Sequence, residues 1–377
     1  MIIPLITYLL LFVVPLIVVP NIVLRFEPPK VLVSEVLIAF LCVYLIATGK
    51  FALKRVNKYL AVLVGCLFFL SLGHLLLSPT DQNLFGNVFR LQGTVLFWNF
   101  LVFALITQNA YFRLKEKSIF LCALIGLGIG SLVFGDNSAG RLIGSVGEPN
   151  ALAAVSIVVF PFVFLSFKSL WVRMLSLIWI FAIINFTESR SALIALIIQL
   201  IFIGTVKLFR GKFLPGLIMS VILISLSLLL PVFDRAYFLQ TNTDPYAFRF
   251  EDRAEIWQVA MLAGAKSPII GSGIETIQGK INKTAQEINA TSQYQVVDSS
   301  HNLLLDYWIW GGSIGLILLG ILIIWTMINL SKKRLYIESV VLVGLLTVLM
   351  FNPTTVSVLL GFWWVIGRSF ANPEVES

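Results

Sequence analysis

The chain has 377 residues, of which 58% are hydrophobic and only 12% are charged, and its mean hydropathy is +0.95. Soluble domains carry about 25% charged residues, so this composition excludes a soluble globular protein. It predicts an all-α polytopic membrane protein with a single membrane domain over residues 1–377. The net charge of +8 is explained by membrane topology, so no nucleic-acid partner is expected.

Twelve mostly apolar runs approach the length that a bilayer core requires, about 20 residues. We predict that each run forms a transmembrane helix. The runs lie near residues 2–24, 31–48, 59–77, 93–107, 118–134, 149–166, 171–186, 190–206, 213–232, 312–330, 335–351 and 355–370. The first run lacks a basic start and is long enough to span, so no cleavable signal peptide is expected.

The basic residues divide the short loops into two sets, and the more basic set is expected in the cytoplasm. That set holds fifteen basic residues: Lys50, Lys54, Arg55, Lys58, Arg113, Lys115, Lys117, Lys168, Arg173, Lys207, Arg210, Lys212, Lys332, Lys333 and Arg334. The other set holds five: Arg25, Lys30, Arg90, Arg141 and Arg190. Both termini are therefore predicted to be cytoplasmic. Residues 233–300, between the ninth and tenth runs, are predicted to form a long loop on the outer face.

A helix is predicted within this long loop. Apolar residues recur there at helical spacing, at Phe250, Ala254, Trp257, Met261 and Ala265, which indicates an amphipathic helix at the outer membrane interface. The helix is expected to end near Ser267, because the residue before a proline avoids helical backbone angles. Arg249 and Arg253 are four residues apart and therefore share one side of this helix.

The long loop closes at His301, one of only two histidines in the chain. Ser299 and Ser300 precede it and are expected to cap a helix start, and Gly311-Gly312 permits a break or kink ten residues later. An imidazole that titrates near neutrality at the edge of a membrane helix is a candidate general base. The alternative is a histidine that only caps or hydrogen-bonds the helix end.

Two arginines are candidates for binding an anion. Arg190 stands in the first turn of a predicted helix, where the helix dipole disfavours a cation, so its position is easier to explain if an anion binds there. Arg253 has the planar donor fork that suits phosphate. The alternatives are a pair of Arg190 with Glu188 or its contact with a lipid headgroup, and solvated pairs of Arg253 with Glu251 or Glu255.

Weaker candidates lie nearby on the predicted outer face. Asn150 is expected to cap the sixth run, and Glu148 is a candidate for orienting an arginine. Gly271 and Gly273 are interpreted as a turn rather than a phosphate cradle.

These residues together resemble the O-antigen ligase family. His301-Asn302, followed after nine residues by Gly312 and after two more by Gly315, is similar to the family signature H-[NSQ]-x9-G-x-x-G. The family's Ser-Arg turn, Arg-x3-Trp helix and Pro-x-x-Gly-x-Gly run are matched in the same order by residues 189–190, 253–257 and 268–273. Residues 147–150 resemble its Pro-Asn turn. The resemblance covers roughly residues 140–330, with Ile194 where the family has leucine.

The resemblance implies a glycosyltransferase C type fold and a glycosyltransferase in the cell membrane that acts in lipopolysaccharide or polysaccharide biosynthesis of the cell envelope. Its donor would be a glycan on a polyprenyl diphosphate such as undecaprenyl diphosphate, and its acceptor a glycan, a lipid or a protein. His301 would be the catalytic base of an inverting transfer on the outer face. Arg190, Arg253 and Arg249 would bind the diphosphate, supported by Asn302, Glu148 and Asn150.

No cofactor and no metal are expected. The chain has no Asp-x-Asp pair, and the loop from Arg25 to Lys30 is too short for the acidic metal site of other membrane glycosyltransferases.

Three alternative functions remain at this point. A flippase or transporter would have twelve helices but is expected to show self-similar halves, which are not evident here. A peptidoglycan-type polymerase would use a carboxylate, for which Asp298 and Asp306 are near enough. Within the family, the sequence does not separate a ligase from a polymerase or a protein O-oligosaccharyltransferase.

Overall fold

The computed structural model describes residues 2–20, 24–49, 56–108, 117–133, 137–138, 141–209, 211–229, 251–274, 276–290 and 297–371. Most of these residues are helical, the helices are joined by turns and loops, and one short antiparallel pair is formed by β1 (Asn137–Ser138) and β2 (Arg141–Leu142). The α-helices are α1 (Ile2–Tyr8), α2 (Glu27–Ala47), α3 (Lys58–Leu77), α4 (Asp81–Phe85), α5 (Thr94–Thr107), α6 (Lys117–Val133), α7 (Pro149–Ser166), α8 (Leu170–Thr187), α9 (Arg190–Leu208), α10 (Phe213–Ser227), α12 (Glu251–Ala265), α13 (Thr276–Glu287), α14 (Leu303–Lys333), α15 (Tyr336–Leu349) and α16 (Val356–Ser369). A π-helical turn η1 (Leu9–Val13) and the 3₁₀ turns η2 (Val14–Leu16) and η5 (Gly144–Val146) complete the described elements.

Six of these helices have at least 18 residues and are apolar enough to cross a membrane, namely α2, α3, α7, α8, α9 and α14. Shorter apolar helices of the described residues lie at Ile2–Leu16, Thr94–Thr107, Ser118–Gly130, Phe213–Ser227, Tyr336–Leu349 and Val356–Ser369. Each predicted apolar run therefore contains a helix. The prediction of an all-α, multi-pass membrane protein is confirmed at this level.

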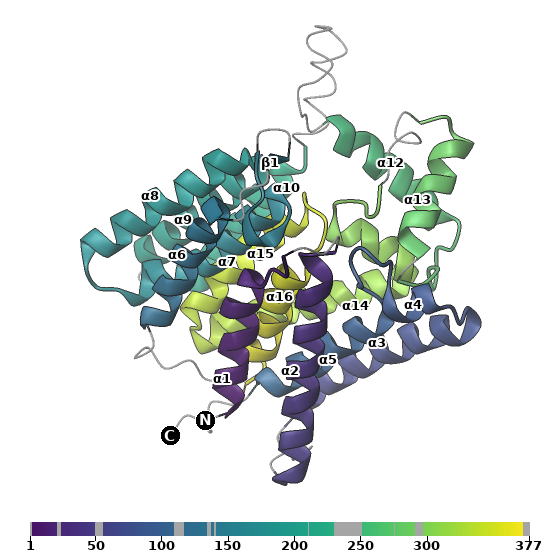
Figure 1. Cartoon of the computed structure of the whole chain (residues 1–377), viewed down its shortest axis with the longest axis horizontal. Coiled ribbons are helices and arrows are strands. Elements are labelled where there is room, and N and C mark those ends of the chain that lie inside the picture. Colours follow the sequence, from purple (N-terminus) through teal and green to yellow (C-terminus); the bar gives the residue numbers. More distant parts are fainter. Residues whose placement is uncertain are drawn as a thin grey trace, which may run out of the picture.

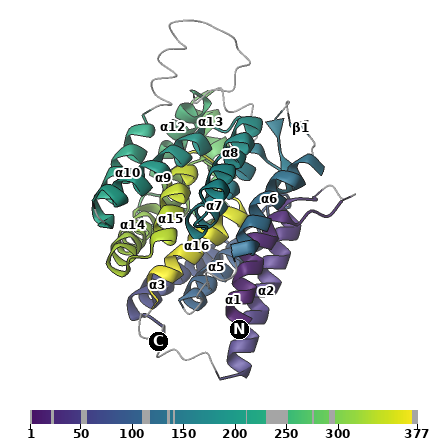
Figure 2. The same cartoon turned by 90° about the vertical axis from the view of Figure 1, so that its left-hand side faces the viewer.

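The polar elements gather at one end of the helical bundle. β1, α12 and α13 lie at this end, and α1 begins at the opposite end (Figures 1 and 2). We call the first of these the His301 end, because α14 starts there immediately after His301. At the opposite end α14 and α16 finish together, since Lys333 Nζ donates a hydrogen bond to the carbonyl oxygen of Ser369.

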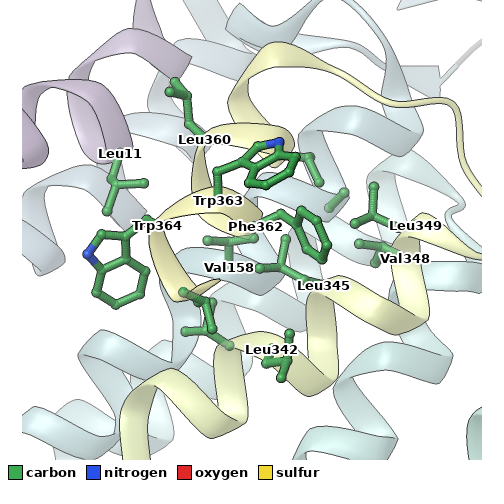
Figure 3. Close-up of a cluster of buried hydrophobic side chains, with 14 of the residues drawn as sticks. Leu11, Val158, Leu342, Leu345, Val348, Leu349, Leu360, Phe362, Trp363 and Trp364 are labelled. Atoms are coloured by element: carbon green, nitrogen blue, oxygen red, sulfur yellow. The ribbon is translucent and has the colours of Figure 1, made fainter. Parts of the chain in front are cut away.

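The last two helices of the chain form the centre of the bundle. Trp363 and Trp364 of α16 are at most 1% exposed and project from the helix in different directions, Trp364 towards Leu11 and Trp363 away from it (Figure 3). A helix that is apolar all round must be buried on all sides or exposed to lipid, and α16 is buried. By contrast, α2, α3, α8 and α14 each bury only about a third or less of their most apolar stretch, so their exposed apolar faces suit lipid.

α14 is broken at Gly312, whose φ of 58° and ψ of −154° are not helical. The run from Pro268 to Gly273 lies against this break and exchanges four backbone hydrogen bonds with it. These bonds run from Ser272 N to Ile309 O, from Gly273 N to Trp310 O, from Ser313 N to Pro268 O and from Ile314 N to Ile269 O, at 2.8–3.1 Å. Backbone groups freed in a membrane helix need partners from the protein itself. The predicted kink at Gly311-Gly312 and the predicted turn at residues 271–273 are therefore confirmed, and they form one unit.

The described part of the long loop contains two helices rather than one. α12 ends at Ala265, close to the predicted end at Ser267. Its residues Ile256, Val259 and Ala263 are buried against the protein, while Met261 is 53% exposed on another side. The sequence pattern thus located the helix but not the face that packs on the bundle. The second helix, α13, was not predicted, and the predicted positions of Arg249 and Phe250 lie outside the described residues.

Candidate active site

His301 lies in a tight turn that starts α14. Its φ is 55°, a left-handed conformation that histidine adopts more readily than most residues. The helix is capped by Asn302, whose Oδ1 accepts hydrogen bonds from Leu304 N at 3.0 Å and Leu305 N at 3.2 Å. The prediction that the two serines cap α14 is therefore wrong. Ser300 instead donates from its backbone N and its Oγ to Asp306 Oδ1, at 2.8 and 2.7 Å, which fixes the turn from within the first helical turns.

Two arginines lie near His301 and keep its imidazole uncharged. Arg253 of α12 is 8% exposed, and Arg90 lies in the segment before α5. Burial, the largest cause, acts with the charges of Arg253 and Arg90 to lower the pKa of His301 from 6.5 to about 4, and the charge of Asp298 partly opposes them. The expectation of an imidazole that titrates near neutrality is therefore wrong for the protein alone. At neutral pH, His301 is ready to accept a proton but is a weak base.

Arg90 was not singled out from the sequence, yet it is central to the site. Its Nε lies 2.6 Å from Asp298 Oδ2, and its Nη1 donates to Thr354 O at 2.9 Å. Its charge also acts on buried Glu148, whose pKa is raised by burial and lowered in part by Arg90. The sequence does contain one observation that could have identified Arg90. It is one of only five basic residues in the short loops predicted to be outside, where lysine and arginine are uncommon.

Arg141, another of those five residues, joins the loop before α7 to the turn before α9. Its Nε donates to Thr187 O at 2.8 Å and its Nη2 donates to Asn150 Oδ1 at 3.1 Å. Asn150 Nδ2 in turn contacts Glu148 Oε1 at 3.4 Å. The prediction that Asn150 caps the sixth run is wrong, because Glu148 is the N-cap residue of α7 and Asn150 lies inside the helix. Glu148 is placed near both Arg141 and Arg90, as an arginine-orienting residue would be.

Arg190 is the first residue of α9 and its side chain is exposed at the His301 end. The start of α9 is held by its second residue, Ser191, whose Oγ donates a hydrogen bond to Asn352 Oδ1 at 2.9 Å. The predicted position of Arg190 in the first turn of a helix is thus confirmed.

The turn between α15 and α16 connects the parts of the site. Met350 O accepts a hydrogen bond from Asn302 Nδ2 at 3.2 Å, and Thr354 O accepts from Arg90. Together with the bond from Ser191 to Asn352, these contacts link α9, the His301 turn and the segment of Arg90. This turn has no motif that the sequence could reveal, because two of these three contacts use backbone oxygens.

Both carboxylates that an alternative mechanism would need already have partners. Asp298 pairs with Arg90, and Asp306 accepts two hydrogen bonds from Ser300. Within the described residues, no group of three or more His, Cys, Asp or Glu side chains is placed to hold a metal ion. The site therefore presents arginine side chains and one neutral imidazole.

The family model described as O-antigen ligase matches residues 175–320. This part of the chain is similar to the O-antigen ligase family. The match runs from α8 to α14 and includes Arg190, Arg253 and His301, whereas Arg90 and Arg141 precede it. The resemblance seen in the motifs is thereby confirmed, and the family indicates a membrane glycosyltransferase of the ligase or polymerase type. A comparison with curated proteins found no match.

Proposed function

We propose that this O-antigen ligase relative transfers a glycan from a polyprenyl-diphosphate carrier to an acceptor hydroxyl on the outer face of the cell membrane. The observation that carries the proposal is the grouping of an uncharged His301 with buried Arg253 at the end of an apolar bundle, beside the ion pair of Arg90 with Asp298. Arginines with planar donor forks suit a diphosphate, and apolar faces of the helices suit a polyprenyl tail. The fold would be of the glycosyltransferase C type.

In the proposed reaction, the acceptor hydroxyl oxygen attacks the anomeric carbon and forms the new glycosidic bond. The bond from that carbon to the diphosphate oxygen breaks, and the lipid diphosphate leaves with the electron pair. Arg253 and Arg190 stabilise the charge that develops on it, and the hydroxyl proton passes to the imidazole of His301. Attack opposite the leaving group inverts the anomeric carbon. The donor's negative charge would also offset the arginines and make His301 a stronger base once the donor is bound.

The arginine assignment predicts a specific loss of donor affinity. Arg190→Ala and Arg253→Ala should each weaken binding of the lipid-diphosphate glycan by about tenfold to a hundredfold, because a charge-assisted hydrogen bond contributes roughly 1.5–3 kcal/mol. Lysine at either position should restore only part of the affinity, since an ammonium keeps the charge but not the fork. Donor binding to purified protein is the measurement.

Arg173→Ala is the matched control, because Arg173 lies in the first turn of α8, at the opposite end of the bundle. Arginine variants that bind the donor as tightly as Arg173→Ala would contradict the assignment, and Arg249→Ala tests the third predicted ligand in the same way.

The proposed orientation predicts which residues are accessible from outside the cell. Gln278→Cys, on α13 at the His301 end, should react with a membrane-impermeant maleimide in intact cells. Lys212→Cys, at the start of α10, should react only after the membrane is opened, because basic loops remain in the cytoplasm. Both variants are made in a background without Cys42, Cys66 and Cys122. The reverse pattern would contradict the orientation and place the site on the cytoplasmic face.

The acceptor distinguishes the activities within the family. Incubating the purified protein with a lipid-diphosphate glycan and with glycan, lipid or protein acceptors, and then weighing the products, separates a ligase from a polymerase or a protein O-oligosaccharyltransferase. The appearance of free lipid diphosphate together with a larger product is the result expected for any of the three. Movement of the intact donor across a liposome membrane without product would favour a flippase.

A further inference from the structure

A cavity opens beside the His301 turn, and the arginine of α9 does not line it. It is walled by the start of α5, by α14 and α16, and by Asn87, Arg90, Gln92, Ile274, Ile277 and Gln278, and it reaches Asp298 and Ser299 of the His301 turn. The described residues of α7, α8 and α9 do not line it. These helices lie to the left of the bundle in Figure 1, whereas α3, α13 and α14 lie to the right. We call this space the α5–α14 cavity.

The floor of the α5–α14 cavity is aromatic. The ring of Phe97 lies 5.4 Å from that of Trp310 and 5.9 Å from that of Trp363, and the ring of Tyr307 lies 5.0 Å from that of Trp310. All four side chains are less than 10% exposed, so their positions are fixed by packing. Figure 3 shows Trp363 directed away from the neighbouring Trp364, which packs near Leu11 instead. The cavity thus has a rigid set of ring faces and edges.

The rim of the cavity is polar but carries no excess of positive charge. Arg90 is paired with Asp298, and Asp306 adds a carboxyl group. Gln278 and Tyr307 also line the cavity, and they add an amide and a phenol hydroxyl to it. The rim therefore offers uncharged donors and acceptors. A diphosphate would gain little there, because the one arginine is already neutralised.

We propose that the α5–α14 cavity binds an uncharged sugar ring of the acceptor. A pyranose has C–H faces that pack on aromatic rings and hydroxyls that bond to amide and phenol groups, which matches the floor and the rim. The cavity is lined by α5, α14 and α16, whereas Arg190 starts α9, so the acceptor and the leaving diphosphate would be held by different elements. This inference rests on the proposed function, and it adds the place and the chemical class of the acceptor.

Protection from labelling tests the site without any transfer activity. Gln278→Cys is placed on the rim in a full-length protein without Cys42, Cys66 and Cys122. Methyl glycosides of glucose, galactose and N-acetylglucosamine are the probes. At least one of them should slow maleimide labelling of Gln278→Cys several-fold and leave Gly279→Cys unchanged, because Gly279 is the next residue of α13 but does not line the cavity. Protection by octanol or by inorganic diphosphate, with none by the sugars, would overturn the proposal in favour of a lipid chain or an anion.

Kinetics provide a second and independent test. Tyr307→Phe removes one hydroxyl from the cavity and should raise the KM for the acceptor by about two- to tenfold, the loss of one neutral hydrogen bond. The donor KM and the rate of donor hydrolysis by water should stay unchanged. Tyr336→Phe is the matched control, since Tyr336 is a partly buried tyrosine at the start of α15, far from the His301 end of the bundle. An unchanged acceptor KM in Tyr307→Phe, in a protein that does transfer glycan, would overturn the cavity assignment alone. Absence of any transfer from lipid-diphosphate donors would instead overturn the proposed function.

Discussion

Replacing His301 with alanine should lower the single-turnover rate of glycan transfer by about 10²–10⁴-fold while leaving donor affinity nearly intact. The reason is that a positioned general base contributes roughly that factor, whereas the diphosphate would be held by arginines on other elements. The measurement is donor affinity and single-turnover rate for the same protein preparation, beside Arg190→Ala and Arg253→Ala. The two classes of variant should separate, with the histidine variant affecting rate and the arginine variants affecting affinity as well.

His301→Asn is the control for the shape of the turn. The φ of 55° at this position is one that asparagine tolerates well, so this variant keeps the turn but cannot act as a base. It should lose as much rate as His301→Ala, and the defect of both should shrink at higher pH, where the acceptor hydroxyl loses its proton more easily. If His301→Ala lost donor affinity as the arginine variants do, with its rate otherwise unchanged, His301 would be a phosphate ligand and not the base.

The pH dependence should report the electrostatics of the same histidine. In the protein alone the pKa of His301 is about 4, so protonation removes the base only when the pH falls towards that value. The acid limb of kcat/KM, which reflects the free enzyme, should therefore lie well below neutrality. A bound diphosphate adds negative charge beside the imidazole and raises its pKa. The acid limb of kcat should accordingly lie at a higher pH than that of kcat/KM, and coincident limbs would contradict this coupling.

The helices were predictable from the sequence because each apolar run is long enough to leave few alternatives to a helix. Which helices lie at the centre was not predictable. α16 and α3 are both predominantly apolar, yet Trp363 of α16 is buried in protein while α3 has an exposed apolar face. Lipid and protein interiors select the same residue types, so composition alone does not distinguish them. α13 was missed for the opposite reason, because its polar sequence buries only Ile281, Thr284 and Ala285.

The candidate site was predictable where a side chain belongs to a motif. His301, Arg190 and Arg253 were found in this way, and the structure places each at the His301 end. Arg90 and Arg141 were missed because their partners include the carbonyl oxygens of Thr354 and Thr187, and a backbone oxygen leaves no trace in the sequence. The lowered pKa of His301 was missed because its causes come from segments that meet only in the folded chain.

The unit formed by the break in α14 and the Pro268–Gly273 run predicts a large loss of stability in two glycine variants. Gly271→Ala and Gly312→Ala should each destabilise the protein by about 3–5 kcal/mol. This is the sum of backbone strain and of the backbone hydrogen bonds between the Pro268–Gly273 run and α14 that must break. Gly271 has a φ of 75° and Gly312 a φ of 58°, both strained for alanine. A Cβ at Gly271 would lie closer than 3.0 Å to the backbone of Trp310, and one at Gly312 would meet the backbone of Ile269 in the same way.

Gly320→Ala is the matched control for these variants, because Gly320 lies in the same helix with nothing within 4 Å of an added Cβ. That change should be neutral or stabilise by up to about 1 kcal/mol, as alanine is the better helix former. Thermal unfolding in detergent and the yield of folded protein are the measurements. Gly271→Ala should also lower glycan transfer by the protein that still folds. The Pro268–Gly273 run donates hydrogen bonds to Ile309 and Trp310, and these residues follow His301 by only about two helical turns. Equal stability of Gly271→Ala and Gly320→Ala would mean that the Pro268–Gly273 run does not hold the break, and that α14 keeps its kink by itself.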